Sequence, residues 1–152
     1  MEKKILYKKS QIGYAVPICV GFVLVFELVS PSKWGISSIF PLVVVAVVAA
    51  IFYKLTIVID EEKIYAYFGY NFFRRKLYLK DINFQDIWID NLPWLTGVGI
   101  RLTSKGCLYN VGLGKAIRII PNDGQVFFVG TKEPEVIEAL LLEMKDSFKE
   151  NS

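Results

Sequence analysis

The chain has 152 residues, of which 53% are hydrophobic and 22% are charged, and it carries a formal net charge of +3. Ordinary globular domains are about 45–50% apolar and about 25% charged, so this composition excludes a disordered chain and argues against a purely soluble one. The net charge resides in residues 1–11, because acidic and basic residues balance from Lys54 onward. A folded part without a basic excess predicts that nucleic acid is not a partner.

Two apolar segments follow the basic start of the chain. Residues 12–29 and 34–53 contain Glu27 as their only fully charged residue. As helices they would measure about 27–30 Å, close to the hydrocarbon thickness of a bilayer. The four residues between them force the two helices to run antiparallel. The sequence therefore predicts a transmembrane helical hairpin over residues 12–53, with Glu27 near one interface.

The basic residues predict how this hairpin is oriented. Four lysines lie in residues 1–11 and Lys54 follows the second segment, whereas the link holds only Lys33. Because positively charged flanks stay in the cytoplasm, we expect a multi-pass protein of the inner cell membrane with both termini cytoplasmic. Residues 1–11 would be a basic cytoplasmic tail, and the lipid bilayer would be a partner. A cleaved signal peptide is the less favoured alternative.

Residues 54–152 have the patterns of a cytoplasmic β domain. Short segments alternate apolar and polar residues, or are bounded by glycine turns: 55–59, 64–68, 72–79, 82–89, 96–102, 107–111, 116–120 and 125–130. Apolar residues then recur on one helical face: Ile137, Leu140, Leu141, Met144 and Phe148. The predicted fold class is α+β: two transmembrane helices, then a bent sheet or open barrel of about seven strands, capped by a C-terminal amphipathic helix.

This arrangement resembles a known family. Its marks are Tyr65–Phe73 leading into Leu77–Ile87, the run 97–101, Gly106 with 109–111, Gly124, and Gly130-Thr131 with Pro134. The order of these segments after a membrane hairpin resembles that of bacterial membrane-anchored proteins with a pleckstrin-homology-like domain. The resemblance implies a non-catalytic module that binds proteins or assembles with itself. Where eukaryotic members bind phosphoinositides, this chain has 60–62, Asp-Glu-Glu, which would repel phosphate.

One candidate binding site is basic. The densest basic cluster of the domain comprises Arg74, Arg75, Lys76 and Lys80. In a domain held beside the inner leaflet, such residues would contact anionic lipid headgroups. The alternative is a solvated hairpin whose charge is balanced by nearby acidic residues.

A second candidate site is apolar, and it comprises Trp88, Leu92, Trp94 and Leu95. Large apolar side chains in a turn must be shielded from water. This segment therefore either packs on the core, enters the membrane interface or binds a protein. We assign these four residues to binding of a protein partner or of a second copy.

The sequence predicts no catalytic site and no cofactor. The chain has no histidine, and no serine or cysteine lies beside a plausible base, so a nucleophilic set is missing. The run 112–115 lacks the first glycine and the final hydroxyl residue of a phosphate loop. Cys19 and Cys107 lie in different parts of the chain, which argues against a disulfide and against a metal site.

These features together predict a non-catalytic, membrane-anchored module for protein binding or self-assembly at the inner membrane surface, in contact with anionic lipid. The alternative is an accessory subunit of a transporter or secretion complex that docks through its transmembrane helices. Small residues favour that alternative, because Gly21 and Ala46 would let helices approach closely.

Overall fold

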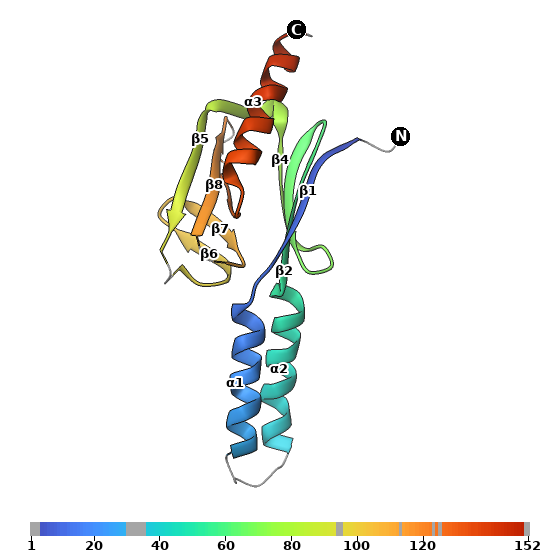
Figure 1. Ribbon diagram of the computed structural model, residues 1–152, viewed down its shortest axis with the longest axis vertical. Coiled ribbons are helices and arrows are strands. Elements are labelled where there is room, and N and C mark those ends of the chain that lie inside the picture. The colour runs from blue at the N-terminus through green and yellow to red at the C-terminus, as the bar shows by residue number, and fades with distance from the viewer. Residues whose placement is uncertain are drawn as a thin grey trace.

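The computed structural model describes residues 4–29, 36–93, 96–112, 114–122, 124 and 126–150. Figure 1 shows a β domain with a helical hairpin projecting from one end. The elements are β1 (Ile5–Ile12), α1 (Ala15–Val29), α2 (Ile36–Phe52), β2 (Lys54–Asp60), β3 (Lys63–Phe68), β4 (Phe72–Tyr78), η1 (Leu79–Asp81), β5 (Ile82–Leu92), β6 (Gly99–Thr103), β7 (Gly106–Asn110), β8 (Gly114–Pro121), β9 (Phe127–Gly130) and α3 (Pro134–Glu150).

The strands form two sheets. The first sheet has the order β1-β2-β3-β4 and is antiparallel throughout. The second has the order β5-β8-β9-β7-β6, in which β7 and β9 pair in parallel. One face of each sheet supplies the main core, which α3 completes by packing on β5 and β8. Its fully buried side chains include Leu55, Ile57, Ile64, Ile117 and Ile137, each worth about 1.5–3 kcal/mol of burial.

The predicted C-terminal helix is present as α3. Ile137 and Leu141 are fully buried, while Leu140 and Met144 pack beside the core. These four positions share one helical face, as the apolar spacing predicts. Figure 1 shows α3 running away from the hairpin, so that its end lies at the opposite pole of the molecule.

The predicted membrane spans over residues 12–29 and 34–53 are corrected by the structure. None of the helices described is long and apolar enough to cross a membrane. The helices have 15 and 17 residues, or about 22 and 26 Å at 1.5 Å per residue, against roughly 30 Å for the hydrocarbon core. They are shorter than the apolar segments partly because Ile12 belongs to β1. The transmembrane hairpin and the multi-pass inner-membrane localisation are therefore not supported.

The predicted fold class is wrong in its sheets as well. Two sheets of four and five strands replace one bent sheet of about seven. One added strand is β1, which occupies most of the expected basic tail and pairs with β2 through Lys8↔Val58 and Ser10↔Thr56. Four consecutive polar residues, 8–11, obscure its alternation in the sequence. Only the antiparallel return of α2 places this segment beside its partner strand.

Two glycines fix the hairpin to the β domain. The Gly13 N–H donates to the Tyr53 carbonyl at 2.8 Å, which joins the two ends of the hairpin. A Cβ at Gly13 would lie 2.6 Å from the Val111 carbonyl oxygen. Gly69 has φ +51°, and a Cβ there would lie 2.8 Å from the Ile51 carbonyl oxygen. Because backbone approaches backbone at both positions, a side chain would force the hairpin away from the sheets.

Candidate functional site

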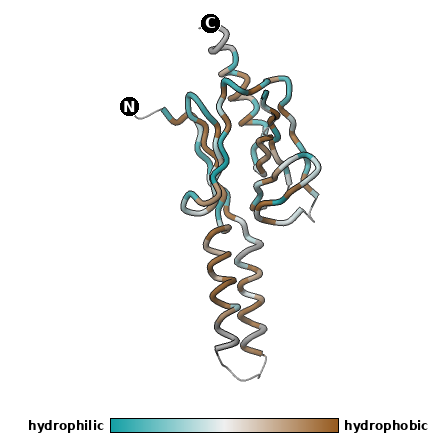
Figure 2. Tube along the Cα trace, turned by 180° about the vertical axis from the view of Figure 1, so that it is seen from behind, coloured by the Kyte–Doolittle hydropathy of each residue, from teal (hydrophilic) through white to brown (hydrophobic). Residues whose placement is uncertain are grey.

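The hairpin of α1 and α2 exposes a large apolar surface. Phe22, Leu28 and Phe40 are 77%, 72% and 71% exposed. The large exposed apolar residues among the described side chains, here called the hairpin surface, are Ile18, Phe22, Leu24, Val25, Leu28 and Val29 of α1 with Phe40, Val43, Val44, Val47 and Val48 of α2. Figure 2 shows the hairpin as a nearly continuous hydrophobic arm. Apolar surface of this extent on a folded protein marks a place of association.

The small residues of the hairpin do not bring its two helices together at Gly21. A Cβ built at Gly21 would meet no atom within 4 Å, and Ala46 is exposed. Both positions are therefore open on the outside of the hairpin. They remain available to a helix from another molecule.

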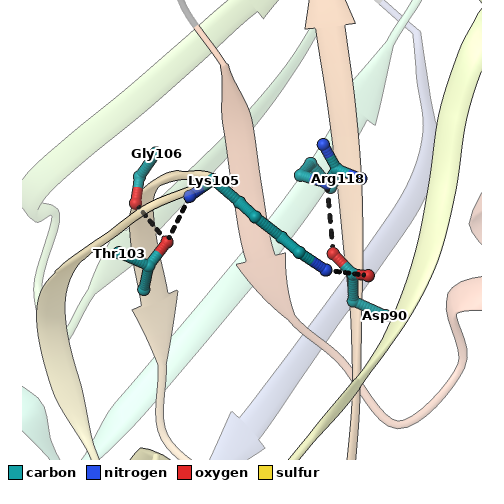
Figure 3. A network of polar contacts seen from close by, with 5 residues as sticks. All are labelled: Asp90, Thr103, Lys105, Gly106 and Arg118. Atoms are coloured by element: carbon teal, nitrogen blue, oxygen red, sulfur yellow. Dashed lines mark hydrogen bonds and ion pairs between the residues drawn. The ribbon is translucent and has the colours of Figure 1, made fainter.

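A second surface lies on the outer face of the second sheet, around Asp90 (Figure 3). Asp90 accepts hydrogen bonds from Lys105 Nζ at 2.8 Å and from Arg118 Nε at 3.1 Å. The Arg118 guanidinium lies 5.7 Å from the centre of the Trp88 ring, because Trp88 and Arg118 are cross-strand partners. Thr103 closes the β6–β7 turn by donating to the Gly106 carbonyl at 2.7 Å. The turn thus positions Lys105 over the sheet.

The two cations determine the charge state of Asp90. Partial burial by itself would raise the pKa of this carboxyl. The hydrogen bond from Lys105 and the positive charges of Lys105 and Arg118 outweigh that effect and hold the Asp90 pKa below its ordinary value. Asp90 is therefore ionised at neutral pH, and the three charged groups stabilise one another.

The structure places two of the predicted partner-binding residues, Trp88 and Leu92, on the outer face of the second sheet. Trp88 is 52% exposed beside the Asp90 network. Leu92 is half-buried, because it packs on a small apolar cluster of Leu108, Ala116 and Phe128. Trp94 and Leu95 lie outside the described residues. Trp88 is thus the one member of the set that is seen as an exposed residue.

The predicted basic cluster is also divided. Arg74, Lys76 and Lys80 are exposed. Arg75 points the other way, and its Nη2 donates to the Val126 carbonyl at 3.1 Å, which links the two sheets. Alternation along β4 is the reason, and it was readable in the sequence, because neighbours in a strand face opposite sides. The cluster missed Lys63, which lies on the adjacent strand β3.

A pocket of about 250 Å³ lies between β1 and the start of α3. Its polar groups bind one another: Gln11 donates to the Gly130 carbonyl at 3.1 Å and accepts the Lys132 N–H at 3.0 Å, while Lys9 pairs with Glu133. Burial and the nearby Glu133 carboxylate raise the pKa of Tyr7 to about 12. These contacts join β1 to the end of β9 and to the residues that precede α3, and they serve the fold. Within the described part of the chain, no group of three or more acidic, cysteine or histidine residues is placed to hold a metal ion.

The molecule is thus a two-sheet β domain with a C-terminal helix, and its exposed features are an apolar arm, a tryptophan beside an ion network, and a basic sheet face. Comparisons with protein-family models, with curated proteins and with solved structures found no match. The resemblance to pleckstrin-homology-like proteins therefore stays a prediction from the sequence.

Proposed function

We propose that this chain is a non-catalytic binding module that assembles with a second copy of itself through the hairpin surface. The observation that carries the proposal is the exposure of eleven large apolar side chains on α1 and α2. At roughly 80 Å² apiece they offer on the order of 900 Å², comparable with the ~800 Å² that each partner buries in an interface of standard size.

A second copy suits this surface because the surface is self-complementary. Glu27 is the one charged residue of α1 and α2, so two hairpins can meet in a symmetric contact through faces that are otherwise free of charge. The open positions at Gly21 and Ala46 permit close approach of a helix from the other copy. The close contacts at Gly13 and Gly69 hold the hairpin so that it projects from the β domain. The sides of the hairpin therefore remain accessible.

Oxidative cross-linking of the full chain tests the proposal. Cys19 is exposed on α1, and Cys107 is the other cysteine. In a Cys107→Ser background, mild oxidation should join two chains through Cys19, and the product should appear as a dimer on a non-reducing gel. Sedimentation of the unoxidised protein should give an oligomer at the same concentration.

A pair of matched variants makes the test specific. Leu24 on the hairpin is 46% exposed and Leu142 on α3 is 41% exposed. Leu24→Asp should abolish the Cys19 cross-link and yield monomers, whereas Leu142→Asp should leave both readouts unchanged. A monomeric wild-type chain would overturn the proposal, whether it binds uncharged lipid vesicles or only a different protein.

A further inference from the structure

The outer face of the first sheet carries a regular pattern of cations and tyrosines. It is formed by Lys63, Tyr65 and Tyr67 of β3, Arg74, Lys76 and Tyr78 of β4, and Lys80 of η1, here called the cation–tyrosine face. Tyr65 lies opposite Lys76 and Lys63 lies opposite Tyr78 in the register of the two strands. The intervening Ile64 and Leu77 point into the core, so the cations and rings share the opposite side.

The cations of this face lie over aromatic rings. Arg74 lies 4.3 Å and Lys63 lies 5.8 Å from the centre of the Tyr65 ring. Lys76 and Lys80 lie 5.5 and 5.9 Å from the centre of the Tyr78 ring. The rings hold the charged groups in place while leaving their positive charge unneutralised.

Few carboxylates balance these charges. Among the described residues, Arg74, Lys76 and Lys80 form no ion pair. Asp60 lies near Lys63, at 3.9 Å, but it is buried and accepts the backbone N–H groups of residues 62 and 63 at 2.9 Å each. Glu61 and Glu62 lie in the β2–β3 turn and line a shallow pocket with Tyr78 and Lys80, at the end of the face away from Arg74. The net positive charge is therefore concentrated around Arg74 and Lys76.

Exposed aromatic residues also lie at the β3–β4 turn, which meets the base of the hairpin at Gly69. Tyr70, Phe72 and Phe73, which follow β3, are 81%, 47% and 53% exposed. Phe73 stacks on Phe52 at the end of α2, with ring centres 5.7 Å apart. The exposed rings thus lie between the cations of β4 and the base of the hairpin. A lipid surface offers partners to both groups, since anionic headgroups adjoin an interfacial region that accepts aromatic rings.

We propose that the cation–tyrosine face binds the headgroups of an anionic lipid surface, with Arg74 and Lys76 as the principal contacts. In this arrangement the protein lies on the lipid surface. An acidic protein segment offers negative charge without an adjoining apolar layer. A single-stranded nucleic acid can stack its bases on exposed rings, but acidic and basic residues balance from Lys54 onward, which disfavours nucleic acid. This inference is separate from self-assembly, and the two are tested by different measurements.

Vesicle flotation of the full chain provides the test. Partitioning is measured on vesicles of pure phosphatidylcholine and on vesicles that also contain phosphatidylserine, and the ratio of the two removes any contribution of the apolar hairpin surface. Arg74→Gln should lower the ratio about fivefold, and Arg74→Gln with Lys76→Gln about 25-fold. Added salt should lower the wild-type ratio as well.

The neighbouring arginine is the matched control. Arg75→Gln removes the same charge from the same strand, but from the side that faces the second sheet, and should change the ratio less than twofold. Circular dichroism and Cys19 cross-linking verify that each variant remains folded and assembled. Equal losses for Arg74→Gln and Arg75→Gln would overturn the proposal. Tighter, Arg74-dependent binding to a single-stranded oligonucleotide or to polyglutamate would overturn it equally.

Discussion

At the scale of single residues, Gly13, just before α1, and Gly21, within it, show how position decides the effect of one methyl group. Gly13 and Gly21 are eight residues apart in the sequence, yet their surroundings are opposite. A Cβ at Gly13 meets the Val111 carbonyl at 2.6 Å, whereas a Cβ at Gly21 meets nothing within 4 Å. The first glycine is required by the close approach of two backbones, and the second is not required within one molecule.

Alanine substitution should therefore have opposite effects at these two sites. We expect Gly13→Ala to lower the free energy of unfolding by about 1–3 kcal/mol through overpacking. Gly21→Ala should raise it by roughly 0.5–1 kcal/mol through better helix propensity. Urea denaturation of the Leu24→Asp background, in which assembly is suppressed, measures both. A loss of stability in Gly21→Ala would contradict the open surroundings described here.

The charge state of Asp90 makes a prediction about pH. Its folded-state pKa is lowered, so ionised Asp90 contributes stability above the ordinary carboxyl pKa, and that contribution is lost as the pH falls below about 4 through the folded-state value. Asp90→Asn should reduce the dependence of unfolding free energy on pH below about 4. Lys105→Gln should reduce it too, since it removes one of the cations that lower the pKa. An unchanged pH profile in both variants would show that the network has no energetic role.

At the scale of elements, the hairpin is an insertion between two paired strands. β1 and β2 are antiparallel neighbours, and the hydrogen bond from Gly13 to Tyr53 holds the two ends of the insertion together. Most of the hairpin lies away from the main core, and among its described side chains Phe52 alone packs beside that core. The β domain therefore contains a core that is complete apart from this one ring.

Replacing residues 15–51 by a short glycine-rich turn tests that independence. We expect the shortened chain to keep its β-sheet circular dichroism spectrum and its cooperative unfolding, because the β1–β2 register is preserved and the core is retained. It should also sediment as a monomer, since the hairpin surface has been removed. An unfolded product would mean that α1 and α2 are required for β1 to find β2.

At the scale of the whole molecule, exposed features follow one another from the hairpin to the β domain. The apolar hairpin surface leads to the rings of Tyr70 and Phe72, and these lead to Arg74 and Lys76 on the first sheet. Figures 1 and 2 show that the hydrophobic arm and the mixed β domain are spatially distinct. This separation allows self-assembly and binding of an anionic surface to be removed independently by substitution.

The local sequence by itself determined those features that depend on residues close together in the chain. The spacing of Ile137, Leu141 and Met144 predicts α3, and the alternation around Ile57 and Ile64 predicts β2 and β3. The two apolar segments likewise predict helices and the short link between them. Local periodicity suffices in these cases because each element buries one face. The apolar residues of that face then recur at a regular spacing along the sequence.

Only the tertiary structure decided where the segments meet. The lysines of residues 5–12 indicate a polar tail until α2 returns the chain and supplies β2 as a partner. Alternation along β4 puts Arg74 and Arg75 on opposite sides, but only the packing of the two sheets decides that Arg74 faces outward and Arg75 reaches Val126. The apolar segments became shorter helices because their ends were drawn into strand pairing and the base of the hairpin. These outcomes depend on hydrogen bonds and packing between residues distant in sequence, which no local pattern contains.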